Sequence, residues 1–88
     1  MEFDWDAANV EHIARHGITP EECEEAYWNG PMVIGTQERQ RERRSLFLGE
    51  TDAARLLTFA ITERKGKMRF VTAHPMHAKQ REICRGEE

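Results

Sequence analysis

The chain has 88 residues, of which 33% are charged and 39% hydrophobic, and it carries a net charge of −3. Residues 1–30 contain eight acids and one base, whereas residues 31–88 contain eight acids and twelve bases. This length predicts one domain over residues 1–88, and no apolar run approaches the roughly 20 residues of a membrane-spanning helix. We therefore expect a cytoplasmic protein without membrane contact. Its two oppositely charged halves either meet different partners or are simply hydrated.

The first thirty residues predict two helices joined at a glycine. Asp4 or Asp6 can cap the first helix, an apolar stripe follows at spacings of three and four, and Gly17 suits its C-terminal end. Thr19 opens a capping box that is followed by proline. The second helix should therefore run over residues 20–28.

The two cysteines do not predict a disulfide framework. Cys23 and Cys84 are too few and too far apart in the chain for such a framework, so we expect free thiols in a reducing compartment. Cys23 should be buried in the second helix by packing against Ile18.

The middle of the chain predicts an antiparallel meander of about four strands. Its expected strands cover residues 32–34, 44–49, 55–62 and 68–73, with short links between the last three. Leu57, Phe59 and Ile61 alternate and should form the inner face, packed under the two helices. Residues 37–44, QERQRERR, are interpreted either as a mobile loop or as the solvated end of a hairpin. A last helix is expected over residues 75–85, which makes the fold class α+β.

The first helix places two histidines on one face, because His12 and His16 are four residues apart. Asn9 belongs to the same polar row. Three interpretations remain open for this face. It is a hydrated or core-edge surface, an RNA-contacting or acid–base surface, or half of a zinc site.

The N-terminal segment resembles the opening of the BrnT-type toxins in residues 3–22, FDWDAANVEHIARHGITPEE. The order of the later elements agrees, with a strand that ends in Thr72 and Ala73 and a short basic helix after it. The resemblance covers nearly the whole chain. It implies a RelE-like fold, in which two N-terminal helices pack on the meander and a short helix ends the chain.

The resemblance also implies a function. Such a chain would be the toxin of a type II toxin–antitoxin module, a metal-independent endoribonuclease that cleaves mRNA and needs no cofactor. A cognate DNA-binding antitoxin, encoded by the adjacent gene, would neutralise it. Two positions depart from the family pattern, because His74 stands where an arginine is typical and Gln80 where a glutamate is typical. Asn9 and Arg15 likewise replace lysines.

RNA cleavage without a metal needs a base, an acid, cations near the phosphate and a planar group to hold a nucleobase. Histidine suits the acid–base role because its unperturbed pKa is near neutrality. The candidate catalytic residues are His74, His77, Lys79 and Arg81. The candidate RNA-binding residues are His12, Arg15, His16, Arg44, Arg69 and Arg85.

Other interpretations of these residues stay open. The chain could be a non-catalytic RNA- or protein-binding module of the same fold, since His74 and Gln80 replace the typical arginine and glutamate. A metal-binding protein that uses four histidines is a further alternative, although nothing in the sequence brings the two histidine pairs together. His74 and His77 could instead be a hydrated helix start. The arginines of residues 39–44 could form a solvated loop, or contact phosphate or the antitoxin.

Overall fold

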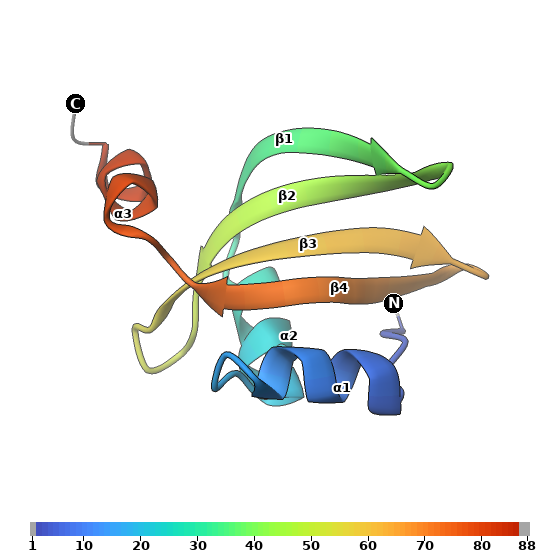
Figure 1. Cartoon of the computed structure of the whole chain (residues 1–88). Helices are drawn as coiled ribbons and strands as arrows, with labels where there is room; N and C mark the ends of the chain where they lie inside the picture. Colours follow the sequence, from blue (N-terminus) through green and yellow to red (C-terminus); the bar gives the residue numbers. More distant parts are fainter. Residues whose placement is uncertain (1, 87–88) are drawn as a thin grey trace.

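The computed structural model describes residues 2–86 as three helices and one four-stranded sheet (Figure 1). In chain order the elements are α1 (Ala7–Ala14), α2 (Pro20–Trp28), β1 (Met32–Arg39), β2 (Glu42–Glu50), β3 (Leu56–Arg64), β4 (Lys67–Pro75) and α3 (Ala78–Arg85). The strands pair in the order β1-β2-β3-β4, each antiparallel to its neighbour. The α+β class and the meander are thus confirmed. No helix within residues 2–86 is long and apolar enough to cross a membrane.

Both N-terminal helices begin at the predicted capping residues. Asp6 caps α1 by accepting hydrogen bonds from the backbone N–H groups of Ala8 and Asn9, at 3.0 and 3.2 Å. The Asn9 side chain accepts in return from the Asp6 N–H at 2.8 Å. Thr19 caps α2 by accepting from the Glu22 N–H at 3.2 Å. These side chains satisfy N–H groups that have no partner inside the helix.

The core lies between these helices and one face of the sheet. Leu57, Phe59 and Ile61 are 0%, 0% and 3% exposed, so the predicted inner face of β3 is confirmed. Cys23 is fully buried beside them as a free thiol, and this burial raises its pKa to about 12. At Gly49 the backbone of α2 comes so close that a Cβ would lie 3.1 Å from the Ala26 carbonyl oxygen, and 2.9 Å from the Phe59 ring of β3.

The first two strands are longer than the sequence indicated. Residues 37–44 are paired ends of β1 and β2, in register across the two strands, so the hairpin interpretation is right and the mobile loop is wrong. Gln40 and Arg41 make the turn with φ angles of 52° and 66°. A two-residue turn with two positive φ angles normally carries glycine or asparagine. The absence of that signal explains why the strand was expected to end at residue 34.

The last helix starts three residues later than predicted. β4 continues to Pro75, and the Met76 N–H still donates to the Leu56 carbonyl at 3.1 Å. The Met76 side chain is buried, so the chain remains fixed to the edge of β3 here. α3 begins only at Ala78, with His77 as its N-cap residue.

A β-bulge decides which way the end of β4 faces. The register shifts at Val71, so that Phe70 and Ala73 both lie in the core although they are three positions apart. Thr72 and His74 consequently point to the opposite face of the sheet. We call this face, which lies opposite the core and is bordered by α1 along β4, the open face. Strict alternation from Phe70 would have placed His74 in the core.

Candidate functional site

Four imidazole rings form a continuous row, which we call the histidine row. The ring centroids are 5.7 Å apart for His12 and His16, 6.0 Å for His16 and His74, and 5.0 Å for His74 and His77. The first two residues belong to the α1 region and the other two to the junction of β4 with α3. The pairs meet because α1 lies alongside β4 (Figure 1). Nothing in the sequence brings the two pairs together; tertiary packing does so.

The row is not arranged as a metal centre. Within residues 2–86, no set of three or more histidine, cysteine, aspartate or glutamate side chains has the geometry to hold an ion. The rings follow one another along the protein surface instead of converging on one point. Their arrangement therefore favours contact with an extended ligand over chelation.

Two of the rings are oriented by hydrogen bonds. His12 Nε2 lies 3.0 Å from the hydroxyl oxygen of Thr72, and His74 Nδ1 lies 2.9 Å from the carbonyl oxygen of Pro75. A carbonyl oxygen only accepts, so Nδ1 of His74 must carry the hydrogen. In the neutral ring, Nε2 of His74 then has a free lone pair. This tautomer is the one that a general base at Nε2 requires.

Gln80 fixes α3 to the open face. Its side-chain oxygen accepts from the Thr58 hydroxyl at 2.8 Å and from the His77 N–H at 2.9 Å. Thr58 is the cross-strand partner of His74, so this contact lies next to the histidine row. The side chain at position 80 thus holds the helix in place, and it supplies no carboxylate there.

Arginine side chains line two adjoining hollows beside α1. The first, of about 400 Å³, is lined by His12, Arg39, Gln40, Arg44, Val71 and Thr72. The second, of about 260 Å³, is lined by Ala8, Asn9, His12, Arg44, Arg64, Arg69 and Val71. We call the two hollows together the arginine valley. His12 belongs to both, so the histidine row opens into the arginine valley at that residue. Neither hollow is lined by His74 or His77, which are connected to the valley through His16 and His12.

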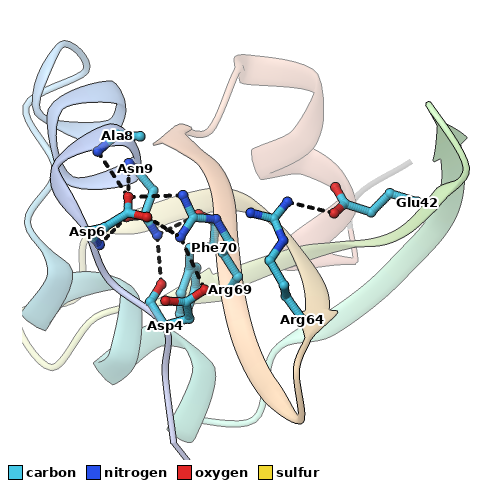
Figure 2. A network of polar contacts seen from close by, with 8 residues as sticks. All are labelled: Asp4, Asp6, Ala8, Asn9, Glu42, Arg64, Arg69 and Phe70. Carbon is cyan, nitrogen blue, oxygen red and sulfur yellow. Dashed lines mark hydrogen bonds and ion pairs between the residues drawn. The ribbon is translucent and has the colours of Figure 1, made fainter.

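Glu42 holds two of the valley arginines. Its carboxylate contacts Arg64 Nη2 at 2.8 Å and Arg44 Nε at 3.3 Å (Figure 2 shows the first of these). The hydrogen bond from Arg64 lowers the pKa of Glu42, and the bond from Arg44 lowers it further. Glu42 therefore stays ionised. The three side chains together leave one net positive charge in a fixed position.

Arg69 is engaged in a network of its own. Its guanidinium donates to both carboxylate oxygens of Asp6 at 3.0 Å and to Asp4 at 3.3 Å, with its side chain only 8% exposed (Figure 2). The bonds to Asp6 raise the pKa of Arg69 and lower that of Asp6. Asn9 strengthens the same junction by donating to the carbonyls of Asp4 and Phe70. These contacts fix the N-terminal segment to β4, and an RNA contact by Arg69 stays a prediction.

The other predicted cations are distributed differently. Arg81 donates to the Met76 carbonyl at 2.7 Å and so stabilises the turn before α3. Arg15, Lys79 and Arg85 are exposed and make no side-chain hydrogen bond or ion pair with any other residue between positions 2 and 86. Their predicted roles at an RNA site are compatible with this exposure but are not tested by it.

Thr58, Arg64 and Thr72 of this region were missed from the sequence, whereas Arg39 was among the arginines for which a phosphate contact was left open. Strand alternation would have separated those arginines. In the register of the hairpin, Arg39 lies opposite Glu42 and Gln37 lies opposite Arg44, so Arg39 and Arg44 share the open face. Arg43 points to the other face. The arginines of residues 39–44 are therefore two sets on opposite faces, which only a hairpin interpretation reveals.

Comparison with known proteins adds a family. The family model described as the ribonuclease toxin BrnT of type II toxin–antitoxin systems matches residues 5–80. That span includes all four members of the histidine row and every arginine of the arginine valley, whereas Arg81 and Arg85 lie beyond it. A search of curated proteins found no match.

Proposed function

Because this chain belongs to the BrnT family of type II toxin–antitoxin ribonuclease toxins, we propose that it is a metal-independent endoribonuclease that cleaves mRNA in the cytoplasm. We further propose a RelE-like fold and neutralisation by a cognate DNA-binding antitoxin from the adjacent gene. One observation carries the catalytic proposal. Four imidazoles form a row that opens into an arginine-lined valley.

In this proposal His74 and His77 perform the acid–base chemistry. Nε2 of His74 removes the proton of a ribose 2′-hydroxyl, and the resulting oxygen attacks the adjacent phosphorus. The bond from phosphorus to the 5′-oxygen breaks, and protonated His77, stacked 5.0 Å from His74, gives that oxygen its proton. The products are a 2′,3′-cyclic phosphate and a 5′-hydroxyl, so no water or metal enters this step.

The arginine valley supplies the binding energy for the polyanion. Arg39 and Arg44 hold the phosphates that lead to the cleaved bond, since Arg can offer two donors to one phosphate. The rings of the histidine row, of which His16 and His77 are exposed and His12 and His74 half-buried, offer stacking surfaces for unpaired bases. Arg15, Lys79 and Arg85 are proposed as further phosphate contacts at the ends of this path.

A second candidate function is a non-catalytic binding module, which Gln80 favours. The Gln80 side-chain oxygen accepts hydrogen bonds from the Thr58 hydroxyl and the His77 backbone N–H. Unlike a glutamate, this amide cannot take up or release a proton. Such a module would bind RNA in the arginine valley without cutting it.

Cleavage in a chelator decides between the two candidates. Purified protein and its His74→Ala variant are incubated with total RNA and excess EDTA, with Lys67→Ala as an exposed control. We expect cleavage by the wild type and the control, cyclic phosphate ends, and a loss of about 10²–10⁴-fold in the variant, the usual effect of removing an acid or base. RNA bound but uncut by the wild type supports the binding module. RNA neither bound nor cut contradicts both.

A further inference from the structure

Exposed apolar side chains are concentrated in one short part of the chain. Five large hydrophobic residues between positions 2 and 86 are strongly exposed, and four of them are Trp28, Met32, Val33 and Ile34, at 63%, 43%, 62% and 39%. We call these four residues the apolar strip. Scattered single residues of this kind need no explanation, but such a concentration indicates an interaction surface.

Three residues of the strip, Met32, Val33 and Ile34, lie on a free edge of the sheet. β1 is the outermost strand and pairs only with β2, so its other side presents unpaired backbone N–H and C=O groups (Figure 1). The outer side of β4, by contrast, is covered by α1 and by the bridge from Phe3 to Met68. A bare edge with apolar side chains is a template for an added strand.

An acidic hollow adjoins the start of β1. It measures about 460 Å³ and is lined by Glu21, Glu24, Glu25, Trp28, Asn29 and Asp52. The Asn29 side chain, which lines this hollow, donates a hydrogen bond to the Glu50 carbonyl at the end of β2. Met32 at the start of β1 pairs with Leu48 of the same strand, so the hollow and the start of β1 lie close together. The lining contains no lysine or arginine, so the hollow repels RNA and attracts a cation. The exposed indole of Trp28 strengthens that attraction through its ring face.

A second copy of the chain fits the strip poorly when the two β1 strands pair over their full length. A register centred on Val33 would pair only the start of each strand. In the full-length antiparallel register, residues 32–34 of one copy face residues 37–39 of the other, so that apolar side chains lie beside Gln37, Glu38 and Arg39. This pairing would bury charged groups without partners, which is costly.

We propose that the apolar strip binds an extended segment of the antitoxin, which adds to β1 as a fifth strand. The segment has aliphatic side chains at alternate positions and a lysine or arginine that enters the acidic hollow. This inference rests on the proposed toxin–antitoxin function. The contact lies at the opposite edge of the sheet from the histidine row, so it anchors the antitoxin without itself covering the row.

Binding measurements with two pairs of variants test the proposal. The probe is the product of the adjacent reading frame, purified and titrated onto the toxin. Val33→Asp should weaken binding by about 30-fold or more, the effect of losing a central interface contact. Lys65→Asp also introduces an exposed aspartate, on the other hairpin, and changes the net charge by −2 instead of −1; it should have no effect. Glu21→Lys should weaken binding severalfold, whereas Glu11→Lys, an exposed acid outside the hollow, should not.

Backbone exchange gives a second and independent readout. β1 amides that point away from β2 should exchange quickly in the free toxin and become protected in the complex. RNA cleavage by Val33→Asp should match the wild type, which shows that the variant is folded.

The outcomes separate this inference from the proposed function. Normal antitoxin binding by Val33→Asp and unprotected β1 amides would overturn the docking site while leaving the toxin function intact. If the wild type is a dimer in solution and Val33→Asp is a monomer, a second copy of the chain, and not the antitoxin, occupies the apolar strip. A wild type that neither cleaves RNA nor binds the adjacent product would contradict the proposed function, and the docking site with it.

Discussion

At the scale of single residues, one carboxylate joins two parts of the site. Asp6 caps α1, which carries His12, and it also forms the paired hydrogen bonds to Arg69 of β4. The same side chain therefore sets both the start of the helix and its position against the strand. This junction holds the two halves of the histidine row at a fixed distance.

The Asp6–Arg69 pair predicts a specific dependence of stability on pH. Because Arg69 lowers the pKa of Asp6, the folded protein binds fewer protons here than the unfolded chain. The stabilisation is therefore complete above the ordinary aspartate pKa of about 3.9 and is lost as the pH falls through the lowered value. Asp6→Asn keeps the cap, since asparagine caps equally well, but loses the charge.

We expect Asp6→Asn to melt at a lower temperature than the wild type at pH 7, with a difference that shrinks below about pH 4. Thermal unfolding followed by circular dichroism at several pH values checks this. Glu2→Gln is the control, because Glu2 forms only an exposed ion pair with Lys67 at 3.7 Å. A difference that stays constant down to pH 2 would show that the pair contributes nothing through its charge.

Residue types in the sequence did not show which side chains come together. Histidine, arginine and lysine predicted an acid–base site for a polyanion, which stays a prediction; the histidine row and the arginine valley bring together histidines and arginines only. In the sequence, Arg69 and Arg44 are both arginines of predicted strands and cannot be told apart as RNA-binding candidates. In the structure, Arg69 forms ion pairs with Asp4 and Asp6. Those partners are more than sixty residues away, so local sequence carries no trace of the pairing.

At the scale of helices and strands, Gly49 sets how closely α2 approaches the sheet. A Cβ at this position would lie 2.9 Å from a Phe59 ring carbon and 3.1 Å from the Ala26 carbonyl oxygen. Neither neighbour can move freely, because Phe59 is fully buried and the carbonyl belongs to the helix backbone. The absence of a side chain here is therefore required by packing.

Gly49→Ala should lower the free energy of unfolding by about 1–3 kcal/mol, the usual cost of overpacking. Gly35→Ala is the matched control, because a Cβ at that strand position has nothing within 4 Å and the backbone is not in the left-handed region. Its effect should stay within about 0.5 kcal/mol. Urea unfolding of both variants gives the answer, and equal stabilities would contradict the close packing of α2 on β2.

Helices were predicted better than strand ends, for a physical reason. The caps at Asp6 and Thr19 are local side-chain contacts, so the sequence displays them directly. The hairpin turn at Gln40 and Arg41 uses residues with no turn preference. The bulge at Val71 depends on register with β3. Both features are imposed by pairing between strands, and both decide which side chains reach the open face.

At the scale of the whole molecule, the uneven charge of the chain becomes two separate surfaces. The acidic first third forms the hollow beside Trp28, and the basic remainder forms the arginine valley. The composition alone predicts an acidic surface for a cationic partner and a basic surface for an anionic partner. It does not predict where these surfaces lie, because their positions depend on the packing of α1 against β4 and on β1 being the outermost strand.

This arrangement predicts different responses to salt for the two proposed ligands. RNA in the arginine valley releases counterions, so three or four phosphate contacts should cost roughly tenfold in affinity or more between 50 and 200 mM salt. Antitoxin on the apolar strip should lose only a few-fold, since burial of apolar surface is little screened. Titrations of both ligands over that range measure the two slopes. Equal slopes would contradict a predominantly apolar docking site.

The strand order β1-β2-β3-β4 places the proposed docking edge on one outermost strand and His74 of the histidine row near the end of the other. Substitutions at residues 32–34 therefore lie away from the histidine row, although Arg39 of the arginine valley lies further along β1. A lineage of such toxins could exchange its inhibitor while keeping its substrate, or change its substrate while keeping its inhibitor. Duplicated modules within one genome could diverge into non-cross-reacting pairs through substitutions around residues 28–34 alone.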